Sequence, residues 1–295
     1  MVDTEKYILI DDNLDKELDG VKYMGSLDDR IHYIMDYIEI TRHLQEIYQW
    51  FDIFNYNLQC IKESVDYHNS IAINSNMISL LSAGKNLVDS LEICMKNNNV
   101  EKYDEFKRQC LSKEYDNCFS YRFLIKLRNF TQHSHIPISC LENDICLDLR
   151  QIYNTPHYNF NEKLKKEVYV LMKEIENNNE NSLLSLPLTV ISYVQSVYRI
   201  YKRFLSIIRL ELIDKRKKCY KIFEDSPELI SNDKYNGFVF YQLSEDNKGL
   251  HTFNINDDPE GLLIQRKNEV IDCLNQENET MKRLSKHLVP IKLNI

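Results

Sequence analysis

The chain has 295 residues, of which 43% are hydrophobic and 28% charged, an ordinary composition for a globular protein with a sizeable core. Six glycines and six prolines are too few for an all-β fold, which needs frequent tight turns. No Gly-rich phosphate-binding motif occurs, which argues against an ATPase or a dinucleotide-dependent enzyme. The formal net charge of −8 argues against broad electrostatic adhesion to nucleic acid, so any such contact must be local.

The cysteines and the N-terminal residues bear on the cellular location of the protein. Eight cysteines are scattered singly with no C-x-x-C pair, so they indicate neither a zinc site nor a disulfide framework. We therefore expect a reducing, cytoplasmic location, with no metal and no cofactor. The first residues lack the basic start and apolar run of a signal peptide, and the uncharged stretch 182–198 is too short and too polar to span a membrane.

Apolar residues at three-and-four spacing predict helices through the first part of the chain, after an N-terminal extension at 1–27. The fourth of these helices must end before Pro137, because proline disfavours helix at the preceding residue. A strand is expected at 145–149, and a further helix at 161–176. The four helices cover residues 28–63, 73–95, 100–111 and a segment that starts near 119.

The polar segment 177–187 reads as a linker between a helical bundle at 28–176 and a second part at 188–295. A long helix follows Pro187, and its near-heptad apolar seam at 190–212 is suited to face either the bundle or a second chain. Alternating residues at 235–253 predict a β-hairpin, and a terminal helix at 261–287 follows. The expected fold is mainly α, an up-and-down helical bundle with a small C-terminal β-hairpin.

The string Arg128-Asn129-Phe130-Thr131-Gln132-His133 stands out for its chemistry. A histidine with a pKa near 6.5 can move a proton to or from an RNA hydroxyl, and a permanently charged arginine can stabilise the developing phosphorane. Asn129 and His133 are four residues apart and share a helix face, while Arg128 must reach round with its long side chain.

This string, with its flanks Tyr121–Leu127 and the upstream segment 80–89, resembles the active-site region of HEPN-superfamily proteins, over roughly residues 70–140. The resemblance implies a helical bundle that pairs with a second copy, so that two Arg/His pairs surround one phosphate. It also implies a metal-independent endoribonuclease, as in toxins and phage-defence effectors. Some members of the superfamily only bind partners, so the alternative is a non-catalytic helical dimer that binds a protein partner or antitoxin.

The Arg/His spacing alone is weak evidence, since Arg128 to His135 and Arg150 to His157 also fit it. The competing interpretation is a solvated arginine and a helix-terminal histidine whose charge suits the helix dipole. If RNA binds, we expect contacts from a basic surface, although a solvated helix face is the alternative there; Tyr198 and Tyr201 would stack on bases. The expected RNA-contacting residues are Arg122, Lys126, His135, Arg199, Lys202 and Arg203.

Overall fold

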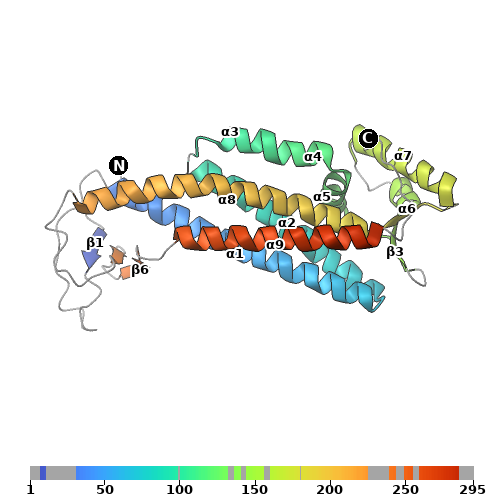
Figure 1. Ribbon diagram of the computed structural model, residues 1–295, viewed down its shortest axis with the longest axis horizontal. Coiled ribbons are helices and arrows are strands. Elements are labelled where there is room, and N and C mark those ends of the chain that lie inside the picture. The colour runs from blue at the N-terminus through green and yellow to red at the C-terminus, as the bar shows by residue number, and fades with distance from the viewer. Residues whose placement is uncertain are drawn as a thin grey trace. The chain divides into compact units, whose positions relative to one another are not determined.

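The computed structural model describes residues 7–10, 31–98, 100–131, 136–140, 144–155, 160–179, 181–224, 239–243, 249–254 and 259–285. Over these ranges the protein is mainly helical, as the sequence predicts (Figure 1). None of the described helices is long and apolar enough to cross a membrane. The longest helices are α1 (Ile31–Asp66), α2 (Ser70–Asn97), α8 (Leu186–Glu224) and α9 (Pro259–Ser285).

The shorter helices lie between α2 and α8 in the amino-acid sequence. One continuous helical stretch contains six residues of π-helix, Lys107–Ser112, a feature that the sequence analysis did not predict. Single π-turns within α-helices are rare and occur frequently at functional sites. The short helices are α3 (Tyr103–Phe106), α4 (Lys113–Asn117), α5 (Phe119–Thr131), α6 (Leu149–Asn154) and α7 (Glu162–Asn179).

Helices α1 and α2 form an antiparallel pair joined by a tight turn (Figure 1). His68 has a φ of 53°, and its N–H donates to the carbonyl of Val65 at 3.0 Å, while the N–H of Asn69 donates to Ser64 at 3.2 Å. This is the Schellman pattern that ends helices, with histidine where glycine is usual. Asn69 then caps α2, since its side chain accepts a hydrogen bond from the N–H of Ala72.

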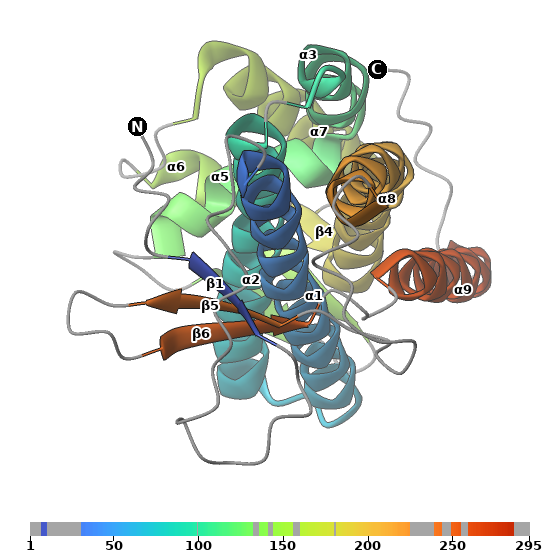
Figure 2. The same ribbon diagram turned by 90° about the vertical axis from the view of Figure 1, so that its left-hand side faces the viewer.

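Two small antiparallel sheets accompany the helices. The predicted hairpin is β5 (Val239–Leu243) and β6 (Gly249–Asn254), and β1 (Tyr7–Ile10) adds a third strand beside β5 (Figure 2). The expectation of a C-terminal hairpin is wrong, because α9 follows it in the chain. The second sheet was not predicted beyond one strand; it consists of β2 (Ile138–Cys140), β3 (Ile145–Asp148) and β4 (Leu183–Ser185) in the order β2-β3-β4.

The chain divides into two compact units, residues 1–44 with 207–266 and residues 45–206 with 267–295. This division differs from the expected one, in which 177–187 is a linker. Within that segment β4 pairs with β3, placing Leu184 opposite Leu147, and the N–H of Leu149 donates to the carbonyl of Ser182. The polar residues around 180 therefore lead into a strand of the larger unit.

An aromatic core holds the larger unit together. Phe51 and Phe54 of α1 meet Tyr198 and Tyr201 of α8, with ring centroids of Phe51 and Tyr201 4.6 Å apart and those of Phe54 and Tyr198 5.8 Å apart. All four side chains are buried. The apolar seam of α8 thus faces the interior of its own chain. At these residues it packs against the helical bundle and not against a second chain.

The smaller unit combines the three-stranded sheet with the ends of long helices. Lys215 is nearly buried and its ammonium lies 3.3 Å from the Asp36 carboxylate. Arg209 pairs with Glu260 at 2.7 Å. These ion pairs join helical segments that are far apart in the sequence.

Candidate functional site

Helix α5 carries the Arg/His string, and its inner face explains why it forms. Phe123, Leu124 and Leu127 are fully buried, with the spacing of one helix face. The helix ends at Thr131, and Ile136 is outside it, as Pro137 predicts. Beyond the helix, the N–H of Ile136 donates to the side-chain oxygen of Asn74 at 2.9 Å, which fixes the chain to α2. His133 and His135 lie outside the described residues.

Arg122 does not take the position expected of an RNA-contacting residue. Its side chain is buried, and its guanidinium donates to Glu167 of α7 at 2.6 and 3.1 Å. The same guanidinium donates to the backbone carbonyls of Tyr115 and Asp116. With its N–H donors occupied in this way and its side chain buried, Arg122 joins α5 to α4 and α7 and is not placed to contact RNA.

Arg128 lies in the last turn of α5, half-buried, with its Nε atom inside the protein. Burial raises the pKa of the Tyr193 phenol on α8 well above its usual value. The positive charge of Arg128 partly opposes that rise. Asn129 beside it is exposed, and Lys126 is half-buried. The structure therefore holds Arg128 against the protein interior while the next residue faces solvent.

A buried phenol cluster, Tyr121 and Tyr193, joins α5 to α8. Tyr193 is 1% exposed and stacks on Tyr121 of α5, with ring centroids 5.8 Å apart and planes 21° apart. Its oxygen occupies the space beside Gly84 of α2, where a Cβ would lie 2.2 Å from it. Gly84 and Tyr193 were missed by the sequence analysis. A glycine inside an apolar helical pattern is the signal that indicates such close approach.

A groove of about 330 Å³ continues along α5 from this cluster. Tyr121 and Ile125 line it, and they precede Arg128 by seven and three residues, so the three share one helix face. The π-helical stretch contributes Lys107, Leu111 and Ser112 to the groove. Helix α2 contributes four residues, which include Glu92 and the ion pair between Lys85 and Asp89.

The charge of this groove is mixed. Glu92 accepts a hydrogen bond from Tyr103 at 2.6 Å, which is the main reason why its pKa lies below the usual value; Lys96 contributes as well. The other groove carboxylates are Asp89 and Asp116, against the cations of Lys85 and Lys107. A polyanion would be repelled over part of this surface, so a long RNA contact is not favoured here.

The basic residues of α8 are arranged differently from the expectation. Arg199 forms two 2.7 Å contacts with Glu114, and this pairing raises the Arg199 pKa. Arg203 pairs with Glu105 at 3.2 Å, and Lys202 is half-buried. These pairs join α8 to α3 and α4 and neutralise most of the expected basic surface.

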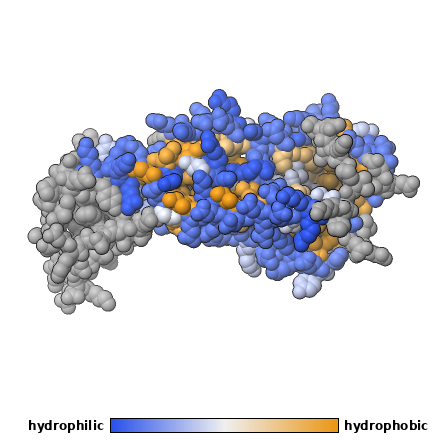
Figure 3. All heavy atoms as spheres, viewed as in Figure 1, coloured by the Kyte–Doolittle hydropathy of each residue, from blue (hydrophilic) through white to orange (hydrophobic). Residues whose placement is uncertain are grey.

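Tyr198 and Tyr201 are buried in the core and are not placed to stack on bases. The molecular face drawn in Figure 3 is largely hydrophilic, with apolar residues exposed between hydrophilic ones. No extended basic surface is therefore formed by the α8 residues named in the sequence analysis. Of the expected contacts in the described chain, Lys126 remains the one beside Arg128.

No family model, curated protein or solved structure matches the chain. In the part of the chain that the structure describes, no group of three His, Cys, Asp or Glu side chains is arranged to hold a metal ion.

Proposed function

We propose that the end of helix α5 is the catalytic part of a HEPN-like endoribonuclease that works without a metal ion. The observation that carries the proposal is the placement of Arg128, half-buried in the last turn of α5 with its Nε atom inside the protein. An arginine held in this way needs little reorganisation to stabilise charge that develops on a phosphate. Asn129, exposed in the adjacent position, supplies polar groups for orienting the RNA.

The proposed reaction uses acid–base chemistry alone. The ribose 2′-oxygen bonds to the neighbouring phosphorus as the bond to the 5′-oxygen breaks, leaving a 2′,3′-cyclic phosphate and a 5′-hydroxyl. His133, two residues beyond the last residue of α5, removes the 2′-hydroxyl proton or protonates the departing 5′-oxygen. Arg128 stabilises the charge on the phosphorane oxygens.

A homodimer belongs to this proposal because one chain supplies one Arg/His pair. Two pairs around a two-fold axis would provide both the base and the acid that the reaction needs. The proposed RNA contact is small, since Arg122 is buried and Arg199 and Arg203 pair with glutamates. We therefore place it at Lys126, Arg128 and Asn129, which suits a short single-stranded target.

The test compares purified variants on a pool of single-stranded RNA in the presence of EDTA. The wild type should cleave, and Arg128→Ala and His133→Ala should each lower the rate by about a hundredfold or more. Arg150→Ala is the matched control, because Arg150 and His157 fit the same spacing while Arg150 is exposed and paired with Glu176. Equal rates in wild type and both motif variants, with their folds intact, would refute the proposal.

A second candidate is a non-catalytic protein that binds a partner, and one observation favours it. Tyr67 and Ile71, at the turn between α1 and α2, are 83% and 82% exposed, an unusual position for two large apolar side chains. This surface replaces the α8 seam, which is buried. In that case Tyr67→Ser with Ile71→Ser should abolish complex formation on size exclusion, while Arg128→Ala leaves it unchanged.

A further inference from the structure

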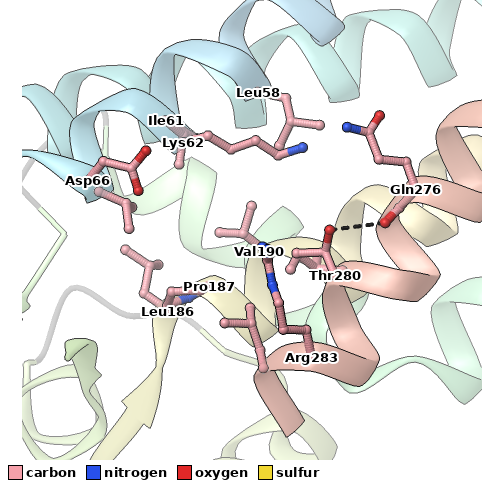
Figure 4. Close-up of a pocket in the computed structure, with 13 residues that line it drawn as sticks. Leu58, Ile61, Lys62, Asp66, Leu186, Pro187, Val190, Gln276, Thr280 and Arg283 are labelled. Atoms are coloured by element: carbon pink, nitrogen blue, oxygen red, sulfur yellow. Dashed lines mark hydrogen bonds between the residues drawn. The ribbon is translucent and has the colours of Figure 1, made fainter. Parts of the chain in front are cut away.

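The larger unit contains a second cavity, which shares no lining residue with the α2–α5 groove. It has a volume of about 320 Å³ and lies between the C-terminal half of α1, the start of α8 and the last turns of α9 (Figure 4). This volume is about twice that of an engineered cavity of about 150 Å³ that accommodates benzene. It falls within the lower part of the range for small-molecule sites.

The apolar wall of this cavity comes from one face of α1 and one face of α8. Leu58, Ile61 and Val65 are spaced by three and four positions on α1, and Leu186 and Val190 by four positions on α8. Each set therefore lies on one side of its helix. All of these side chains except Val65 are buried, so the wall belongs to the core, and an apolar molecule gains by leaving water to lie against it.

The charged residues of the lining are Lys62, Asp66 and Arg283, which together carry one excess positive charge. The Lys62 ammonium is already held from outside the lining, because it donates to the carboxylate of Glu277 at 2.6 Å. That pair is neutral as a unit. The cation that a ligand can reach is therefore Arg283.

Arg283 has no hydrogen bond or ion pair with any residue that the structure describes. Figure 4 shows its side chain extending from α9 toward Val190 on α8. The nearby Thr280 hydroxyl donates to the backbone carbonyl of Gln276 at 3.0 Å, so it does not compete as a donor. The N–H groups of this guanidinium form a planar fork that matches the two oxygens of a carboxylate.

The exposure of the charged groups orients the ligand. Arg283 is exposed, so a group that pairs with it stays at the mouth of the cavity while an apolar body enters between α1 and α8. Asp66 is also exposed, at the last residue of α1, and water and salt screen its repulsion of an anion that does not touch it. A cationic head group would instead be repelled by Arg283.

We propose that this cavity binds a small aliphatic carboxylate, with its hydrocarbon body against α1 and α8 and its carboxylate paired with Arg283. Burial of the body against Leu58 and Val190 gives most of the affinity. The pair with Arg283 gives the selectivity for an anion, because a neutral molecule of the same length gains no such contact.

The test uses octanoate as the probe and 1-octanol as its neutral counterpart, with binding to the full chain followed by calorimetry at neutral pH. Wild type should bind octanoate saturably and more tightly than 1-octanol. A cavity without a usable cation would show the opposite order, because bringing a charge to an apolar wall costs free energy. Val190→Phe, which fills the cavity, should weaken the binding of both probes, with its fold checked by circular dichroism.

The role of the guanidinium is tested in Arg283→Gln, which changes an exposed position and should leave the fold intact. Its octanoate affinity should fall at least about fivefold, while its 1-octanol affinity changes by less than about twofold. Lys282→Gln is the matched control: it removes the same charge from the adjacent exposed position, which does not line the cavity, so octanoate affinity should be unchanged.

Three results would each overturn the proposal. The first is the absence of saturable octanoate binding to wild type, and the second is tighter binding of 1-octanol than of octanoate. The third is an equal octanoate affinity in Arg283→Gln and Lys282→Gln.

Discussion

The phenol oxygen of Tyr193 on α8 occupies the space that a side chain at Gly84 on α2 would need. A Cβ at position 84 would lie 2.2 Å from that oxygen and 3.0 Å from Cε2 of Phe54. The absent side chain lets the phenol enter the α2–α5–α8 interface, where it stacks on Tyr121 and lies within the field of Arg128. The packing of α2 against α5 and α8 thus depends on one glycine.

Gly84→Ala should destabilise the protein by about 1–3 kcal/mol, measured by urea denaturation, although alanine is the better helix former. The reason is overlap with a buried hydroxyl that has little room to move. Tyr193→Phe removes that oxygen, so the double variant should regain part of the lost stability. Strictly additive effects of the two substitutions would show that the hydroxyl is not the obstacle.

Arg122→Met should cost about 3–5 kcal/mol, because it leaves Glu167 nearly buried without its partner. Arg199→Met is the comparison, since the Arg199 side chain is 44% exposed and its pair should contribute less than about 1 kcal/mol. Thermal and urea unfolding of both variants measure the difference. Similar losses in the two would contradict the structural role of Arg122.

His68→Gly should raise the stability by about 0.5–1 kcal/mol. Glycine avoids the cost of about 1–2 kcal/mol that an L side chain incurs at positive φ, and this exceeds the added entropy of the unfolded chain. His68→Ala serves as the control, because alanine keeps the Cβ and should give no such gain. A stability loss in His68→Gly would show that the imidazole itself holds the turn.

Burial raises the pKa of the Cys146 thiol to about 11. The unfolded chain ionises this thiol near its ordinary pKa of about 8.5, so stability from this residue is intact below that pH and decreases as pH rises toward 11. Cys146→Val should remove this part of the alkaline loss. Mass spectrometry after iodoacetamide treatment at pH 8.5 should show exposed Cys140 modified well before Cys146.

Helix positions were predictable from the sequence because their evidence is local. The apolar spacing along residues 28–63 and 73–95 is realised in α1 and α2, and Ile136 lies outside α5, as Pro137 predicts. The hairpin followed from alternation around a turn-prone segment. Each of these signals depends on neighbours within a few residues.

The remaining features depend on contacts between distant residues. β4 has only three residues and is stabilised by its pairing with β3. Residues 183–185 by themselves therefore do not predict a strand. The sequence around Arg122 is that of a surface cation, because its partner Glu167 lies 45 residues away in the chain. Arg199 and Glu114 are 85 residues apart, so the sequence does not predict their pairing either.

The proposed chemistry is tested most directly by the ends of the cleaved RNA. A synthetic single-stranded RNA that wild type cuts in EDTA is compared with the same strand carrying a 2′-deoxynucleotide on the 5′ side of the cut. We predict a 2′,3′-cyclic phosphate on the first strand, no cut at that position in the second, and loss of cleavage in Arg128→Ala. Cleavage of the deoxy-substituted strand at the same position, or undiminished cleavage by Arg128→Ala, would contradict the proposed chemistry.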